Sequence, residues 1–170
     1  RLQGDWSSDV CSSDLAVCAQ HPFEDLKYHK PSLRLTYAEG IKLLREAGYE
    51  IGDTDDLSTA QEKALGAIVK ERYGTDFFMM DKYPLTIRPF YTMPDPTNPE
   101  LSNSYDFFLR GEEIVSGAQR IHDPELLVKQ AVAKGMKVST IQSYVDSFRH
   151  GALPHGGGGV GLRSEEHTSE

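Results

Sequence analysis

The stretch of sequence that decides the fold runs from residue 104 to 119 and reads Ser104-Tyr105-Asp106-Phe107-Phe108-Leu109-Arg110-Gly111-Glu112-Glu113-Ile114-Val115-Ser116-Gly117-Ala118-Gln119. Aromatic residues in its first half and β-branched residues in its second half favour strands. Arg110-Gly111 at the centre suits a tight turn, so the stretch predicts a β-hairpin with strands at 104–109 and 112–119. In such a hairpin Leu109 faces Glu112 and Phe108 faces Glu113.

Four helices are predicted around this hairpin, because each start signal is matched by a glycine stop. Capping boxes or N-cap patterns stand at Thr36-Tyr37-Ala38-Glu39, Thr59-Ala60-Gln61-Glu62, Asp123-Pro124 and Ser139-Thr140-Ile141-Gln142. The corresponding stops are Gly48, Gly74, Gly135 and Gly151.

Two further strands are predicted between the second and third helices, at 76–80 and 85–91. Pro94, Pro96 and Pro99 mark residues 90–100 as a loop. Helices followed by strands and then by helices favour an α+β fold, with an antiparallel β-sheet flanked by helices, over alternating βαβ units.

The composition narrows the possible classes of protein. The chain has 170 residues with a formal net charge of −8, and 38% of its residues are hydrophobic. That length suits one domain, and its apolar runs at 64–69 and 77–80 are far shorter than the roughly 20 residues of a membrane span. The acidic balance disfavours a general nucleic-acid-binding surface. Two cysteines cannot form a disulfide scaffold or a four-thiolate metal site.

The two ends of the chain, 1–15 and 163–170, are predicted to be translated sequencing adapter. The tail Arg163-Ser164-Glu165-Glu166-His167-Thr168-Ser169-Glu170 can be encoded as AGATCGGAAGAGCACACGTCTGAA. The reverse complement, read one base in, encodes Ser-Asp-Val-Cys-Ser-Ser-Asp-Leu, which is the sequence of residues 8–15. Complementary coding at both ends is not expected of a genuine polypeptide, so residues 16–162 carry the expected domain.

The hairpin places two carboxylates near each other. Asp106 and Glu113 lie diagonally on one face of the predicted strands. Two such charges repel unless a cation lies between them, and an oxygen-only ligand set suits magnesium. From their spacing alone, two solvated charges on an open sheet face remain the alternative.

Two other features could bind ligands. Arg120 carries a planar fork that matches a carboxylate or phosphate, although a surface arginine is the simpler interpretation. The run from Gly156 to Gly159, with Gly161, literally matches G-x-G-x-x-G but follows a helix and Pro154-His155 instead of a strand. The dinucleotide-binding interpretation is therefore rejected, which leaves a flexible linker or a close backbone approach to a nucleotide.

Several segments together resemble the cytosolic, eukaryotic-type aspartate–tRNA ligase family. They are Phe90-Tyr91-Thr92-Met93-Pro94-Asp95, Ser104-Tyr105-Asp106, Arg110-Gly111-Glu112-Glu113-Ile114-Val115-Ser116-Gly117-Ala118-Gln119-Arg120-Ile121-His122-Asp123, and the segment from Pro154 to Leu162. The resemblance runs from about residue 22 to 162. It implies a partial class II aminoacyl-tRNA synthetase catalytic domain.

The resemblance also implies roles for single residues. Glu113 and Asp106 would hold Mg²⁺ bound to the phosphates of ATP, with Ser116 near that metal and the amino acid. Arg120 would bind the side-chain carboxylate of L-aspartate, and Gly158, Gly159 and Gly161 would lie against ATP. The reaction would proceed through aspartyl-adenylate to aspartyl-tRNA(Asp), in a cytoplasmic homodimer without a membrane anchor. The nucleophile would be the substrate carboxylate, so no catalytic protein nucleophile is expected.

The sequence also departs from the family pattern. The family's last glycine-rich motif continues as Gly-Leu-Glu-Arg, whereas Gly161-Leu162 is followed here by Arg163. The dimer-forming motif, the arginine for the α-phosphate and the anticodon-binding barrel would all precede residue 16. We therefore expect a C-terminal fragment of the catalytic domain that is inactive by itself. The alternatives are an asparagine–tRNA ligase, an aspartate–ammonia ligase of the same fold, or a non-catalytic synthetase-like binding module.

Overall fold

A five-stranded β-sheet forms the centre of the computed structural model, which describes residues 19, 20, 22 and 24–161. The strands follow one another across the sheet in chain order: β1 (Leu33–Thr36), β2 (Phe77–Asp81), β3 (Ser104–Leu109), β4 (Glu112–Gln119) and β5 (Gly156–Val160). Strand β1 runs parallel to β2, and the other pairs are antiparallel. The predicted α+β class is confirmed, with one parallel pair in the sheet. The ends assigned to adapter, 1–15 and 163–170, lie outside the described residues.

The β3–β4 hairpin forms as the sequence predicts. Arg110 and Gly111 have φ values of 52° and 80°, the left-handed pair that a two-residue hairpin turn requires. Leu109 pairs with Glu112 and Phe108 with Glu113. A β-bulge follows, because Phe107 pairs with Val115 and leaves Ile114 without a partner residue. The bulge brings Ser116 directly opposite Asp106.

The turn of this hairpin packs closely against a helix. A Cβ added at Gly66 would lie 2.3 Å from the Cα of Gly111, so neither position leaves space for a side chain. Gly66 belongs to the helix α3 (Thr59–Tyr73), which crosses the hairpin at this point. Two glycines therefore allow the backbones of the helix and of the turn to touch.

The four predicted helices are present as α2 (Tyr37–Glu46), α3, α4 (Pro124–Ala133) and α5 (Gln142–Arg149). All four glycine stops have positive φ values, between 68° and 93°. Thr36 with Glu39 and Asp123 with Pro124 cap α2 and α4 as predicted.

Two helix starts differ from the prediction. The capping box of α3 is Ser58 with Gln61, one residue earlier than expected, and the Ser58 amide donates to Gln61 Oε1 at 2.9 Å. Residues Val138–Ile141 form a 3₁₀ turn before α5, so the predicted cap at 139–142 is wrong.

One predicted strand is wrong, and two strands were not predicted. Residues 85–91 form a short 3₁₀ helix at Leu85–Ile87 followed by turns. Pro84 precedes this segment and Pro89 lies within it, and neither proline has an amide proton to donate to a sheet. Strand β1 was missed, and the glycine run is strand β5 and not a linker.

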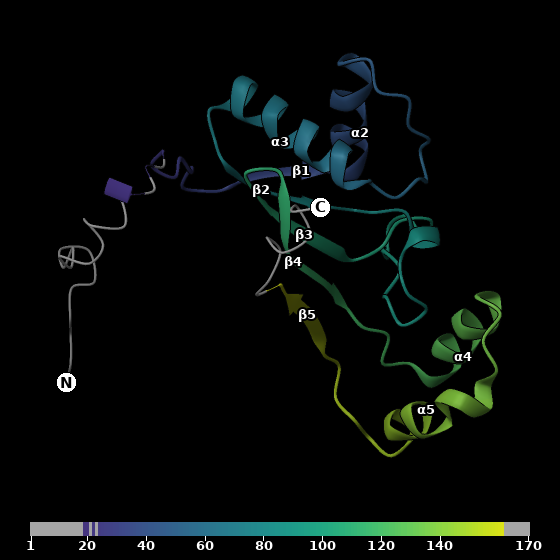
Figure 1. Ribbon diagram of the computed structural model, residues 1–170. Coiled ribbons are helices and arrows are strands. Elements are labelled where there is room, and N and C mark those ends of the chain that lie inside the picture. Colours follow the sequence, from purple (N-terminus) through teal and green to yellow (C-terminus); the bar gives the residue numbers. More distant parts are fainter. Residues whose placement is uncertain (1–18, 21, 23, 162–170) are drawn as a thin grey trace, which may run out of the picture.

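The two pairs of helices make two separate cores. Figure 1 shows α2 and α3 near β1 and β2, with α4 and α5 beyond the far end of β4. The first core joins α2, α3 and one face of the sheet through Leu44, Leu65, Phe78, Met80 and Phe108. The second joins α4, α5 and the segment after β4 through Ile121, Leu127, Val145 and Phe148. The sheet surface between these cores stays open to ligands.

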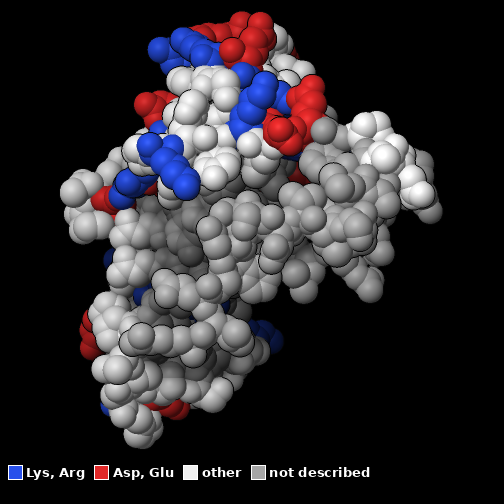
Figure 2. Space-filling view, turned by 90° about the vertical axis from the view of Figure 1, so that its left-hand side faces the viewer, with Lys and Arg blue, Asp and Glu red and all other residues white. Residues whose placement is uncertain are grey.

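The outer surface near α3 carries charges of both signs. In Figure 2 basic and acidic side chains are interspersed at the top of the molecule. Lys70 of α3 pairs with Glu24 at 2.8 Å, and Arg72 pairs with Glu46 at 3.0 Å. The mixture does not form a basic patch on this part of the described surface, in line with the acidic composition.

Candidate functional site

A cavity of about 290 Å³ lies over β4 and β5 and is closed on one side by the segment between β2 and β3. Its lining includes four residues that the sequence singled out, namely Ser116, Arg120, Gly158 and Gly159. The structure therefore brings together Ser116 of β4, the two glycines of β5, and Arg120, which directly follows β4. A larger hollow of about 1340 Å³, between α2 and α4, is lined by none of the candidate residues.

Arg120 is held at the cavity by its backbone. Its amide donates to the carbonyl of His155 at 3.0 Å. Arg120 also forms an isolated antiparallel β-bridge with Thr92 of the opposite loop. Its guanidinium carbon lies 5.2 Å from the centre of the Tyr91 ring. Among the described residues, no carboxylate lies within ion-pair distance of this guanidinium. Arg120 can therefore offer its fork to the carboxylate of a ligand.

Strand β5 gives the Arg120 side chain its space. A Cβ at Gly157 would lie 2.6 Å from Arg120 Nη2 and 2.9 Å from its guanidinium carbon. A Cβ at Gly158 would lie 3.3 Å from the carbonyl oxygen of Ser116. The glycine run thus brings its backbone close to Arg120 and β4, and its approach to a nucleotide stays a prediction.

Asp106 and Ser116 form a polar pair beside the cavity. Asp106 is 3% exposed, and its Oδ1 accepts a hydrogen bond of 2.7 Å from Ser116 Oγ. Its Oδ2 accepts from Arg88, a residue of the loop between β2 and β3. Ser116 Oγ donates its proton to Asp106 and accepts a long hydrogen bond of 3.4 Å from Arg88, which leaves one oxygen lone pair to accept from a ligand.

Glu113 lies outside the lining of the cavity, on the exposed part of β4. Desolvation and the nearby charge of Asp106 raise the pKa of Glu113. Glu62 of α3 faces the same region, and desolvation followed by the charge of Glu113 raises its pKa to about 7. Glu113 pairs with Phe108, two residues from Asp106, so the two carboxylates lie diagonally across the hairpin. Gly161 donates its amide to Ile114 at 3.0 Å and does not line the cavity.

The carboxylates of Asp106 and Glu113 are the candidate cation ligands near β4. No group of three or more His, Cys, Asp or Glu side chains within the described ranges is arranged to hold a metal ion by itself. Glu113 and Asp106 offer carboxylate oxygens, and each Asp106 oxygen keeps a further lone pair beyond its protein hydrogen bond. This chemistry fits Mg²⁺, which uses one or two protein carboxylates together with substrate phosphates and water.

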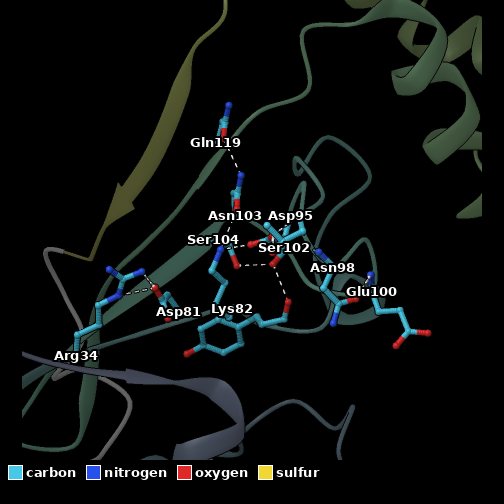
Figure 3. A network of polar contacts seen from close by, with 12 residues as sticks. Arg34, Asp81, Lys82, Asp95, Asn98, Glu100, Ser102, Asn103, Ser104 and Gln119 are labelled. Atoms are coloured by element: carbon cyan, nitrogen blue, oxygen red, sulfur yellow. Dashed lines mark hydrogen bonds and ion pairs between the residues drawn. The ribbon is translucent and has the colours of Figure 1, made fainter.

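A polar network fixes the loop that closes the cavity (Figure 3). Lys82 pairs with the buried Asp95, whose pKa is held well below its ordinary value by Lys82 and by hydrogen bonds from Thr97. Ser102 Oγ donates to the carbonyl of Tyr83 at 2.9 Å, and Asn103 Nδ2 donates to Gln119 Oε1 at 2.9 Å. These contacts tie both ends of the loop to the sheet.

The lining residues that were given no role by sequence reasoning include Arg88, Tyr91, Thr92 and Ser104. Tyr91, Thr92 and Ser104 stood within the segments that carried the family resemblance, which was the available signal. Arg88 had no such signal, because it was placed in a strand that does not form. None of the helices within the described residues has the length and apolar character to cross a bilayer.

Comparison with known proteins defines the class to which this arrangement belongs. The family model of the class II tRNA synthetases (D, K and N) matches residues 9–163. The chain therefore belongs to this family of class II tRNA synthetases, as the sequence predicted.

The most similar relatives narrow the class further. The chain is 62% identical over 146 residues to the cytoplasmic aspartate–tRNA ligase of Homo sapiens, covering 86% of the chain and 29% of that protein. It is 57% identical over 161 residues to the corresponding protein of Caenorhabditis elegans, covering 95% of the chain and 30% of that protein. The chain thus spans less than a third of the length of these relatives.

Among solved structures, an aspartyl-tRNA synthetase is more similar to the chain than an asparaginyl-tRNA synthetase is. An aspartyl-tRNA synthetase from Entamoeba histolytica superimposes with a TM-score of 0.82 at 55% identity, covering 87% of the chain and 30% of that structure. An asparaginyl-tRNA synthetase from Pyrococcus horikoshii, complexed with asparaginyl-adenylate, gives a TM-score of 0.70 at 30% identity, covering 78% and 30%. The fold predicted from the sequence is confirmed by these superpositions.

Proposed function

We propose that this chain forms part of an enzyme that ligates L-aspartate to tRNA(Asp) with ATP, through an aspartyl-adenylate. The observation that carries the proposal is Arg120, a guanidinium without an acidic partner among the described residues, directed at a cavity of about 290 Å³. A cavity of that size suits a small amino acid. The fork of Arg120 matches the side-chain carboxylate of aspartate.

The residues around Arg120 complete an amino-acid site on this proposal. Ser116 donates its proton to Asp106 and accepts from Arg88, so its remaining lone pair accepts from the amino group of the substrate. The charge of Asp106 lies next to Ser116 and favours a cationic group there. Aspartate is then held by a basic group at its side chain and by an acidic group near its amino end.

ATP and Mg²⁺ lie beside Asp106, Glu113 and strand β5 in this proposal. Glu113 and Asp106 hold Mg²⁺, and when bound this ion neutralises phosphate charge. Gly158 and Gly159, together with Gly161, present backbone without side chains, so a nucleotide can approach β5 closely. Support for these assignments comes from the oxygen-only donors and from the exposed glycine strand.

Both nucleophiles of the proposed reaction belong to the substrates, so the protein mainly binds and orients them. The attacking group is the α-carboxylate of aspartate, and the acceptor in the second step is a ribose hydroxyl of tRNA. Residues of this chain therefore contribute by orienting aspartate and by balancing charge. A homodimer and a cytoplasmic location are part of the proposal, and the names of the cytoplasmic relatives support the location.

An asparagine–tRNA ligase is the second candidate, since structures of that enzyme share the fold. Arg120 disfavours this candidate, because the neutral side-chain amide of asparagine would not balance the charge of the unpaired guanidinium. Identity is also lower, at 26–30% for the asparaginyl-tRNA synthetases of Pyrococcus horikoshii and Entamoeba histolytica, against 44–55% for two aspartyl-tRNA synthetase structures. An aspartate–ammonia ligase would share the aspartate site, whereas a non-catalytic module would not need Asp106, Glu113 and Arg120 in one place.

The test uses a full-length chimera: the human relative with its matched 146-residue segment replaced by that of this chain. Exchange of pyrophosphate into ATP is measured with aspartate, asparagine or lysine as the amino acid, followed by charging of tRNA(Asp). We expect exchange and charging with aspartate alone. A folded chimera that prefers asparagine, or that exchanges with no amino acid, would contradict the proposal. Exchange with aspartate but no charging of tRNA would favour the aspartate–ammonia ligase.

A further inference from the structure

Arg88 occupies an unusual place in the cavity wall. It follows the 3₁₀ helix Leu85–Ile87 and reaches back over the sheet, and its side chain is only 15% exposed. Its guanidinium carbon lies 3.8 Å from the centre of the Tyr83 ring. It therefore lies over an aromatic face, which limits its freedom to rotate.

The fork of Arg88 is directed at two protein groups of the site. Its Nη2 donates to Asp106 Oδ2, and its Nη1 lies 3.4 Å from Ser116 Oγ. Ser116 in turn donates to the other carboxylate oxygen, Oδ1, of Asp106 at 2.7 Å. The three side chains form a closed ring of contacts, and each fixes the orientation of the next.

The same contacts decide the charge of the cavity. Arg88 offsets part of the negative charge of the buried Asp106, whereas Arg120 has no such partner among the residues of the described part. Without Arg88, the negative charge of Asp106 would stand unbalanced within reach of the substrate and would oppose a second carboxylate. Ser116 would also lose a neighbour that fixes its hydroxyl.

We propose that Arg88 is a positioning residue for the aspartate pocket, acting through Asp106 and Ser116 and not on the substrate carboxylate itself. This inference rests on the proposed function, because it assigns the carboxylate to Arg120. Lysine cannot replace Arg88 fully, since a single ammonium cannot contact Asp106 and Ser116 in a fixed fork while lying on Tyr83.

The experiment is a double-mutant cycle in the full-length chimera defined above. Arg88→Met, Arg88→Lys and Ser116→Ala are made singly, together with the Arg88→Met/Ser116→Ala double variant. The readout is kcat/KM for aspartate in pyrophosphate exchange. We expect Arg88→Met to lower it about 100-fold, the cost of a misplaced binding group, and Arg88→Lys about tenfold. In the Arg88→Met background, Ser116→Ala should cost no more than about threefold further.

The matched control is Arg34→Met. Arg34 also faces a buried carboxylate of the same sheet, that of Asp81, but it lies on β1 away from the cavity. Its loss removes a similar counter-charge and lowers the melting temperature, while kcat/KM for aspartate should stay within about twofold. If Arg88→Met does not fold, Arg88→Lys and its double variant with Ser116→Ala carry the same cycle.

The outcomes separate the two proposals. A folded, unsubstituted chimera without aspartate-dependent exchange refutes the proposed function. In an active chimera, additive effects of Arg88 and Ser116, or an equal loss in Arg34→Met, refute the positioning role alone. Full activity of Arg88→Met would refute it as well. A loss of preference for aspartate over asparagine in Arg88→Lys would mean that Arg88 contacts the substrate carboxylate directly.

Discussion

Replacing Arg120 by glutamine should remove most of the affinity of the site for aspartate. The backbone contact of Arg120 with His155 does not depend on the side chain, so the fold should persist. Loss of the contact with the Tyr91 ring costs only about 0.5–1 kcal/mol of stability. The substrate carboxylate, by contrast, loses its counter-charge inside a small cavity, a cost of about 3–5 kcal/mol. At tenfold per roughly 1.4 kcal/mol, this is at least about a hundredfold in aspartate activation.

Arg120→Lys separates charge from shape. It keeps the positive charge but not the planar fork, so aspartate should bind more weakly than in the unsubstituted enzyme and better than in Arg120→Gln. The assay is the initial rate of pyrophosphate exchange in the full-length chimera, with aspartate and ATP varied separately. The KM for ATP should change little, because Glu113 and Asp106 are assigned to the metal–phosphate end.

A surface arginine supplies the control. Arg72→Gln removes an exposed guanidinium on α3 that pairs with Glu46, far from the cavity lining, and should leave both KM values unchanged. If Arg120→Gln keeps the unsubstituted dependence on aspartate, or loses ATP affinity as severely, Arg120 is not the carboxylate receptor. It would then be a surface arginine, as its sequence context alone allows.

Three further predictions concern the glycine strand, the acidic surface and the chain ends. Gly157→Ala should raise the KM for aspartate at least about tenfold in pyrophosphate exchange, because the new Cβ would displace the Arg120 guanidinium from which it lies 2.6–3.0 Å away. Glu62→Gln should raise the free energy of unfolding at pH 8 by on the order of 1–3 kcal/mol and change it little at pH 4, as measured by urea unfolding. Genomic DNA should contain no in-frame codons for residues 5–15 or 164–170, and finding them would refute the adapter assignment.

The sign of the Glu62 effect follows from its raised pKa. Its pKa of about 7 in the folded protein lies above the ordinary value of 4.5, so the native state binds more protons within that interval. Stability linked to Glu62 is therefore present at low pH and is lost as the pH rises from about 4.5 to about 7. Glu71→Gln, on the exposed side of the same helix, is the control, and equal stabilisation by both variants would remove Glu62 from the explanation.

A control for Gly157 is available on the same strand. A Cβ at Gly156 would meet only the carbonyl oxygen of Ala118, at 3.3 Å, so Gly156→Ala should disturb aspartate binding much less. Equal effects of the two substitutions would mean that strand β5 itself is disrupted and that the guanidinium is not specifically displaced.

The hairpin and the helices could be predicted because local rules decide them. Arg110 and Gly111 meet the φ requirement of a tight turn, and each helix stop needs a residue that accepts positive φ. The bulge at Ile114 could not be predicted, since it depends on how β4 pairs with β3 over several residues. Strand β5 was missed because glycine has a low strand propensity. Its formation depends on pairing with β4, which the local sequence does not show.

The site shows the same division between local and distant causes. Arg120 and Ser116 stand in one short segment, and their chemistry could be inferred from residue type. Arg88 acquires its role only because the chain folds back and places it against Asp106 and Ser116, which are 18 and 28 residues away in sequence. The contact between Lys82 and Asp95 that anchors this loop is likewise tertiary. The strand predicted at 85–91 was wrong because tertiary contacts of this kind, which hold the segment as a loop, are not visible in the local sequence.

The most direct test of the central claim is a crystal structure of the full-length chimera with a non-hydrolysable aspartyl-adenylate analogue. We predict that the side-chain carboxylate of the analogue lies in the cavity over β4 and β5, in a two-bond contact with the Arg120 guanidinium at about 2.7–2.9 Å. Arg88 should remain on Asp106 and Ser116. A carboxylate bound by Arg88, or an analogue placed in the larger hollow between α2 and α4, would contradict the account.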